Sequence, residues 1–169
     1  MAYTPPSNVS TGDVLTATRY NADVVANMTA LYGSMRRLAY QTRTTTYSVS
    51  ASTTGAAADV FATDLSWTAD GSSYMVQWWF PYLDFGTAAV PRILLVDGSG
   101  NDLGWLSVYT TGITNIPQGT TWYTPAAGTA TLNLRANNGG SGTATIGMGT
   151  GGSGNYHPGW MAVWGPALT

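Results

Sequence analysis

The chain has 169 residues, enough for one domain with a real hydrophobic core and a small appendage. Only 8% of the residues are charged, against roughly 25% in typical soluble domains, and neither Lys nor Glu occurs. The net charge of −2 excludes a basic surface for nucleic acid, and the absence of Cys excludes disulfides and thiolate chemistry. No run reaches the roughly 20 apolar residues of a membrane span. We therefore expect no nucleic-acid partner and no membrane insertion.

The first 39 residues are predicted to form a docking region with two parts. Residues 1–10 contain Pro5 and Pro6 and are expected to form an extended arm, which is easily ordered only when it lies on something else. Residues 11–39 carry the one convincing helical pattern of the chain, with Thr16 as its N-cap. Side chains at heptad spacing along this helix are Ala17, Asn21, Val24, Met28, Leu31, Met35 and Leu38. Such a seam allows identical helices to pack together, although the same stripe is also able to pack on the chain's own β-domain.

Residues 40–169 are predicted to form a separate β-domain. From Tyr40 onward the apolar residues recur with a period of two, which is typical of strands. Strands are expected within residues 42–51, 60–67, 73–80, 92–96, 103–109, 129–136, 143–148 and 159–165. A turn at 69–72 and a hairpin loop at 97–101 connect neighbouring strands. About eight short strands punctuated by Gly and Pro predict a mainly β fold, an antiparallel β-sandwich or jelly roll.

Two of these strands have patterns clear enough to assign their faces. In 129–136, the residues expected to point inward are Ala130, Leu132, Leu134 and Ala136, and those expected to point outward are Thr131, Asn133 and Arg135. In 73–80 both faces are largely apolar, which predicts a central strand covered on one side by a second sheet and on the other by a neighbouring subunit.

A search for catalytic chemistry finds little. The single histidine, His157, lies in a loop context, and no Ser stands in a G-x-S-x-G elbow. A calcium site built from Asp97, Asn101 and Asp102 does not match the EF-hand spacing, although it remains an alternative. The sequence therefore predicts a protein that is not an enzyme and that holds no cofactor or metal.

The aromatic residues are the stronger functional candidates, since seven Trp and ten Tyr are many for this length. The tryptophans expected in the core or at a subunit interface are Trp67, Trp78, Trp105, Trp160 and Trp164. Trp79, Trp122 and Tyr123 are candidate ligand-facing aromatics, because an exposed aromatic ring stacks well on a sugar ring.

Several motifs resemble those of tailed-bacteriophage virion proteins. The segments TPP at 4–6, GDVLTA at 12–17 and YN at 20–21 are similar to the Pro-containing arm and "G-D-V-L-T-A-x-x-[WY]-N" opening of that family. Residues 74–82 resemble an aromatic strand of small phage head and tail appendages. Residues 128–136 resemble their "G-T-x-x-L-x-x-R-A" strand, and 159–163 resemble their closing strand.

The resemblance implies a homotrimeric virion appendage, made in the host cytoplasm and carried on the particle surface. In that family three helical arms bind other virion proteins of the capsid or tail, and three β-sandwiches form a TNF-like or C1q-like head. The arm residues to which the resemblance gives a docking role are Tyr3, Pro5, Pro6, Val14, Leu15 and Tyr20. The absence of a long repetitive shaft favours a capsid decoration, head fibre or minor tail protein over a long receptor-seeking fibre. The alternative is a tip protein that binds a host receptor or surface glycan through exposed aromatics.

Overall fold

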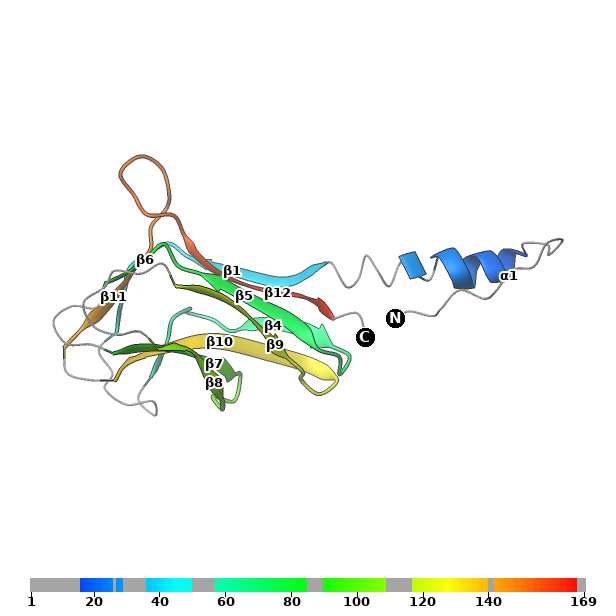
Figure 1. Cartoon of the computed structure of the whole chain (residues 1–169), viewed down its shortest axis with the longest axis horizontal. Coiled ribbons are helices and arrows are strands. Elements are labelled where there is room, and N and C mark those ends of the chain that lie inside the picture. The colour runs from blue at the N-terminus through cyan, green and yellow to red at the C-terminus, as the bar shows by residue number, and fades with distance from the viewer. Residues whose placement is uncertain are drawn as a thin grey trace.

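The computed structural model describes residues 16–25, 27–28, 36–49, 57–84, 90–108, 117–139 and 142–166. Within these residues the chain is mainly antiparallel β-structure (Figure 1). Its helical elements are α1 (Ala17–Tyr20) and the π-helical turn η1 (Asn21–Val25). The first six strands are β1 (Arg37–Arg43), β2 (Tyr47–Val49), β3 (Ala58–Asp59), β4 (Leu65–Ala69), β5 (Tyr74–Trp79) and β6 (Tyr82–Asp84). The next six are β7 (Pro91–Asp97), β8 (Asp102–Val108), β9 (Gln118–Tyr123), β10 (Gly128–Asn138), β11 (Ala144–Gly147) and β12 (Gly159–Pro166).

The strands form two facing layers. One layer contains a four-stranded sheet in the order β1-β12-β5-β9, and the other contains a five-stranded sheet in which β3 and β4 both pair with β10, followed by β7 and β8. In Figure 1 strands β1, β12 and β5 lie above strands β10, β7 and β8. All the pairings are antiparallel, which is the arrangement of a β-sandwich. The predicted fold class is therefore confirmed at the level of an antiparallel sandwich.

A third, three-stranded sheet continues the first layer. Its order is β2-β11-β6, and β2 follows β1, β6 follows β5, and β12 follows β11 along the chain. The order β2-β11-β6 therefore matches the β1-β12-β5 part of the larger sheet, and each strand of the small sheet is next along the chain to its counterpart. The extension between β11 and β12 is interrupted by the loop 148–158, which rises from this end of the sandwich in Figure 1.

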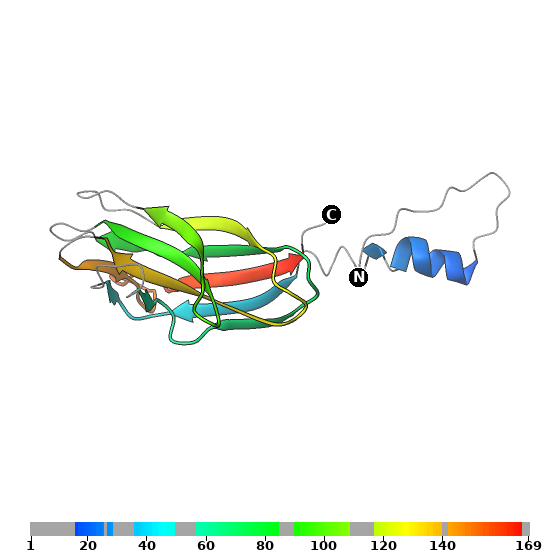
Figure 2. The same ribbon diagram turned by 90° about the horizontal axis from the view of Figure 1, so that it is seen from below.

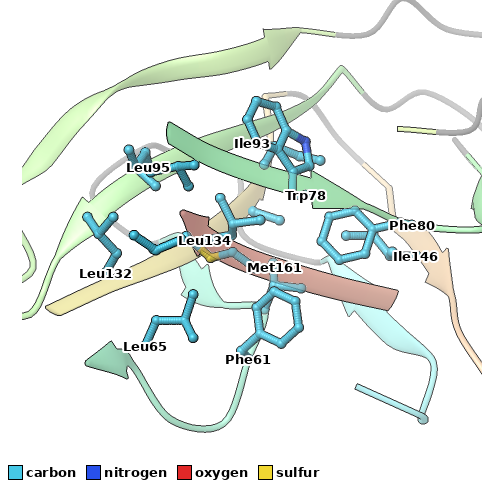
Figure 3. Packing of buried hydrophobic residues seen from close by; sticks show 14 of the residues in the cluster. Phe61, Leu65, Trp78, Phe80, Ile93, Leu95, Leu132, Leu134, Ile146 and Met161 are labelled. Atoms are coloured by element: carbon cyan, nitrogen blue, oxygen red, sulfur yellow. The ribbon is translucent and has the colours of Figure 1, made fainter. Parts of the chain in front are cut away.

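The core lies between the two layers because alternate residues of each strand point inward. Trp78 and Met161 from the four-stranded sheet meet Leu132 and Leu134 from β10, as Figure 3 shows. The predicted inward residues of β10 all belong to this cluster: Ala130, Leu132, Leu134 and Ala136. Gly119 of β9 faces Trp78 so closely that an added Cβ would lie 2.2 Å from its indole ring. The size of the Trp78 ring thus explains the glycine at this position.

The two predicted connections are present and are held by Asp side chains. At 69–72, a carboxylate oxygen of Asp70 accepts hydrogen bonds from the Tyr74 hydroxyl at 2.7 Å and the Ser72 amide at 2.9 Å. These bonds stabilise the charged form and lower the pKa of Asp70 to about 2. At 97–101, Asp97 accepts hydrogen bonds from the Asn101 side chain and backbone, each at 2.8 Å, and these bonds lower its pKa. Both turns follow the usual pattern in which Asp caps its own loop.

The predicted end of the N-terminal helix is wrong. Arg37 and Leu38, which the prediction placed in the helix, instead lie in strand β1. In this strand Arg37 pairs with Trp164 and Ala39 pairs with Val163 of β12. The Leu38 side chain packs against the sandwich core and is not part of a helical seam. Pairing with β12 overrides the local helical pattern, because without β1 the edge of β12 would present unpaired backbone groups. The β-structure therefore begins ahead of the predicted boundary at Tyr40.

Three details of the predicted strands also differ. The expected strand at 42–51 covers the end of β1 and the separate strand β2, and of the expected strand at 60–67 only residues 65–67 are strand, as the start of β4. Strand β9 was not predicted at all. Asn133 does lie on the face of β10 opposite the core, but it is buried, because its amide donates to the Phe61 carbonyl at 3.1 Å and to Asp64 at 2.9 Å. A segment of the chain's own backbone covers this position.

The helical residues α1 and η1 lie beyond the end of the sheets in both Figure 1 and Figure 2. Their exposed apolar side chains include Tyr20 at 46% and Val25 at 44%, and the nearby Met28 is 53% exposed. No helix among the described residues has the length and apolar character needed to cross a membrane.

Candidate binding face

The outward side of the four-stranded sheet, here called the open face, carries three cross-strand rows of side chains. Residues directly opposite one another on neighbouring strands point to the same face, so the register determines each row. The first row is Thr42, Trp160, Trp79 and Gln118. The second row is Tyr40, Ala162, Gln77 and Thr120. The third row is Arg37, Trp164, Met75 and Trp122.

Two tryptophans form a ridge across the middle of the first row. Trp79 of β5 and Trp160 of β12 are directly opposed, and both are half-buried. Tyr40 of β1 lies beside Trp160, with 6.4 Å between the ring centroids and a tilt of 36° between the planes. Tyr40 is itself 45% exposed. Tyr40 thus continues the aromatic strip onto a third strand, and the name ridge is kept for Trp79 and Trp160 alone.

Two open hollows, each of about 410 Å³, flank the ridge. The first hollow lies toward β9, where the lining residues besides the ridge are Gln77, Trp78, Gln118, Gly119 and Thr120. The second hollow lies toward β1, where Tyr40, His157 and Pro158 join the two tryptophans. Volumes of this size lie within the roughly 300–1,000 Å³ range of small-molecule sites.

The polar side chains of the first hollow are neutral amides and a hydroxyl, and the second hollow adds the Tyr40 hydroxyl and the imidazole of His157. The Gln77 side-chain amide donates a long hydrogen bond of 3.4 Å to the Thr120 hydroxyl, and Gln118 is exposed beside them. Among the described residues, no Asp or Arg lines either hollow. Arg37 lies on the same face, with its guanidinium carbon 4.1 Å from the centre of the Tyr40 ring. That contact is of the cation–π kind and occupies a face of the ring.

The loop 148–158 supplies one wall of the second hollow through His157 and Pro158. Its neck is closed by two backbone hydrogen bonds, from Gly149 to the His157 carbonyl at 3.2 Å and from Gly151 to the Tyr156 carbonyl at 2.8 Å. The Tyr156 ring stacks on Tyr82 with centroids 5.2 Å apart and planes at 14°. This wall is therefore held in place by the sheet beneath it.

The three predicted ligand-facing aromatics do not share one face. Trp122 is 57% exposed and Trp79 lies on the ridge, so both stand on the open face. Tyr123 points the other way, because neighbouring strand residues alternate, and its ring packs edge-on against Trp67 with centroids 6.3 Å apart. Tyr123 is therefore part of the core boundary and does not face a ligand on this side.

The other tryptophans divide between core and open face. Trp67 and Trp78 are buried in the core as expected. Trp160 and Trp164 are not in the core, because they lie on the open face opposite Trp79 and Met75. Sequence reasoning missed Tyr40 and Trp160 as site residues. In 159–165 both alternating sets are apolar, so the pattern gives no sign of which set points outward.

The predicted docking and self-association residues are only partly described. Ala17 and Asn21 are exposed, and Val24 is half-buried. Together with the exposed Tyr20 and Met28, they leave the self-association role a prediction. The positions that lie outside the described residues are Tyr3, Pro5, Pro6, Val14, Leu15, Leu31 and Met35, and the side chain of Trp105 also lies outside them.

In the described part of the chain, no group of three or more His or Asp residues lies close enough together to hold a metal ion. Both carboxylate oxygens of Asp97 accept hydrogen bonds within its own loop, and Asp102 accepts one from the Gly104 amide at 2.8 Å. These bonds account for the acidic residues at 97–102 without an ion. What the two hollows offer chemically is aromatic stacking and hydrogen bonding by amide, hydroxyl and imidazole groups.

No protein-family model and no curated protein sequence matches this chain. Among solved structures, the chain is similar to the C-terminal CBM6 of LamC, a marine laminarinase from Zobellia galactanivorans. The identity is 15%, the coverage is 71% of this chain and 99% of that one, and the TM-score is 0.34. It is also similar to VP2 of infectious bursal disease virus in a subviral particle, with 14% identity, 79% and 38% coverage and a TM-score of 0.38. The CBM22-1 xylan-binding domain of Paenibacillus barcinonensis Xyn10C gives 11% identity, 76% and 87% coverage and a TM-score of 0.30. Likenesses this distant carry no information on ligand or activity.

Proposed function

We propose that this chain is a non-enzymatic structural subunit of a bacteriophage particle, a homotrimeric surface appendage with its jelly-roll-like sandwich outward. It attaches to other virion proteins of the capsid or tail through residues 1–36, a segment here called the leader. The leader is the part of the sequence that resembles the opening segment of phage virion proteins. The proposal therefore places the protein on the virion surface.

The observation that carries this proposal is the exposure of apolar side chains on the leader. Tyr20, Val25 and Met28 are 44–53% exposed, and the helical residues that bear them lie away from the sheets. If these apolar side chains packed on the chain's own β-domain, they would be buried there. Apolar side chains presented in this way are suited to burial against other chains, where each contributes in proportion to the area removed from water.

Symmetry supports the same conclusion. A homotrimer presents three identical leaders to one particle, so that weak contacts made by each leader combine through their high effective concentration. Only 8% of the residues of the chain are charged, so few charges oppose close contact between copies.

The test uses the full chain and light scattering to measure its mass in solution. We expect a mass near three times the 17.7 kDa chain, and we expect Met28→Asp to lower it, because a charge would then enter the buried seam. Thr45→Asp is the matched control, since Thr45 is exposed on the β-domain. A full chain that stays monomeric at all concentrations contradicts the trimer.

A second measurement addresses the particle. Mass spectrometry of purified virions of the phage that encodes the chain is expected to detect it in multiples of three copies. Absence of the chain from those virions would overturn the proposed function.

A second candidate function is favoured by the open face: a tip protein that binds a host receptor or surface glycan. The ridge and the exposed Trp122 present aromatic rings to solvent on one side of the sandwich. This function is compatible with the first, because the leader and the open face are different parts of the chain.

A further inference from the structure

We infer that the ridge is a binding site for a neutral oligosaccharide that crosses Trp79 and Trp160 and places one sugar residue in each hollow. This inference rests on the second candidate function and names its site and its ligand class. It changes the residues involved, since Tyr40, Trp160, Gln77 and Gln118 join Trp79, whereas Trp122 and Tyr123 lie outside the site.

The ridge has the shape that sugar stacking requires. A pyranose ring has one face made of C–H groups, and such a face packs on the flat side of an indole or phenol ring. Trp79 and Trp160 face one another across neighbouring strands, and Tyr40 continues the strip with its ring 6.4 Å from Trp160. Because the rings come from three strands of one sheet, the sheet holds them in place before any ligand arrives, which limits the entropy lost on binding.

The hollows provide room on both sides of the ridge. Each has about 410 Å³, and the two share Trp79 and Trp160 as a common wall. A ligand that fills both must therefore pass over the ridge. We accordingly expect the affinity to rise from a monosaccharide to a di- or trisaccharide and then to level off.

The hydrogen-bonding groups favour hydroxyls as partners. Gln77, Gln118 and Thr120 each carry a donor and an acceptor, as a sugar hydroxyl does. The internal bond between Gln77 and Thr120 is long, at 3.4 Å, so a ligand hydroxyl replaces it at low cost. A proline-rich peptide, which also binds aromatic grooves, would offer mainly carbonyl acceptors to these groups.

Charge selects the neutral class. Among the described residues that line the hollows there is no Asp and no Arg, and the one side chain able to carry a positive charge is His157, in the wall of the second hollow. The nearby Arg37 is already placed over the Tyr40 ring at 4.1 Å. In the first hollow an acidic sugar would lose hydration without gaining an ion pair, and this cost discriminates against it.

The experiment presents the full chain to an array of neutral hexasaccharides of glucose, mannose and N-acetylglucosamine, with hyaluronan hexasaccharide as the acidic counterpart. Titration calorimetry then measures the best neutral ligand. We expect Trp79→Ala to weaken binding by about 30-fold, as for a central aromatic contact. Gln118→Ala is expected to weaken it by about 3- to 10-fold, because it removes one or two hydrogen bonds.

Trp122→Ala is the matched control, since it removes a tryptophan from the same face but from neither hollow, and its affinity is expected to stay within about twofold of the parent. Circular dichroism checks the fold of each variant, and Gln118→Ala decides the outcome if Trp79→Ala does not fold.

The inference is overturned if no neutral glycan binds, if the acidic glycan binds best, or if Trp79→Ala and Gln118→Ala leave the affinity unchanged. Binding of a proline-rich peptide in place of every glycan, or a change of mass in Trp79→Ala that reveals a second copy on this face, also overturns it. None of these outcomes alters the incorporation of the chain into virions, so the two proposals fail separately.

Discussion

The two outer faces of the sandwich differ in how far their apolar side chains are exposed. On the five-stranded sheet, Leu94 and Val96 of β7 are only 1% and 3% exposed although they stand on the side away from the core. On the four-stranded sheet, Trp122 and Tyr40 are 57% and 45% exposed in outward positions of the two edge strands, β9 and β1. We call the first of these sides the covered face, in contrast to the open face.

On the covered face, polar side chains are tied to the chain itself. Asn133 of β10 donates hydrogen bonds to the Phe61 carbonyl and the Asp64 carboxylate, which lie in the segment between β3 and β4. Arg135 adds an ion pair with Asp59 at 2.6 Å. The same fold therefore buries apolar residues on one outward side and presents aromatic rings on the other. The open face is thus the side of the sandwich available to a ligand.

The largest effect is expected from Leu94→Ala on the covered face. Removing a fully buried leucine side chain leaves a cavity, and we expect the free energy of unfolding to fall by about 2–5 kcal/mol. Trp122→Ala removes a larger side chain from the open face, yet it should change this free energy by no more than about 0.5 kcal/mol. Urea denaturation measures both. Equal losses in the free energy of unfolding for Leu94→Ala and Trp122→Ala would contradict the difference between the two faces.

A smaller effect is expected from the buried amide. Asn133→Leu keeps the volume but leaves the Phe61 carbonyl without its donor, and we expect a loss of about 1–3 kcal/mol in the free energy of unfolding. Gln77→Leu on the open face is the control and should stay within about 0.5 kcal/mol. If the control costs as much as Asn133→Leu, then the polar groups of the open face are structural.

The smallest effect concerns acid. The pKa of Asp70 is about 2 in the folded protein against 3.8 ordinarily, so the unfolded chain takes up a proton first as the pH falls. Stability contributed by this charge is complete above about pH 4 and is lost as the pH falls toward 2. In Asp70→Asn, the free energy of unfolding that is lost over this pH range should be smaller by less than about 1 kcal/mol, since Asp70 is exposed. Denaturant titrations between pH 2 and 5 measure the slope, and an unchanged slope would contradict the role of the Tyr74 hydrogen bond. Some slope will remain in the variant because Asp97 also has a lowered pKa.

Much of the sandwich follows from local pattern. Strand β10 was predictable because small and branched apolar residues alternate with polar ones, and the two Asp-capped turns carry their own signals. Strand β9 was not predictable, since QGTTWY has no apolar alternation and gains its place by pairing with β5. Leu38 was misassigned because pairing with β12, a partner far away in the sequence, decides the conformation there.

The site was predictable only in part, and for a similar reason. Trp79 stands out because it follows the inward Trp78 in a clear strand. Trp160 and Tyr40 become site residues only through register, which aligns β1, β12 and β5 on one side. Trp122 and Tyr123 lie on opposite faces because they are neighbours in β9, a strand that the sequence pattern did not reveal.

The neck of the loop 148–158 separates the tip of that loop from the wall that it supplies. His157 is fixed below the two backbone hydrogen bonds, whereas Gly152 and Gly154 at the tip have positive φ angles of 94° and 79° and open space where a Cβ would stand. Foreign peptide inserted between these glycines would extend from the end of the sandwich while the hollow kept its shape. The chain therefore has a built-in position for displaying epitopes or affinity tags, and one at which natural variants are free to differ in length.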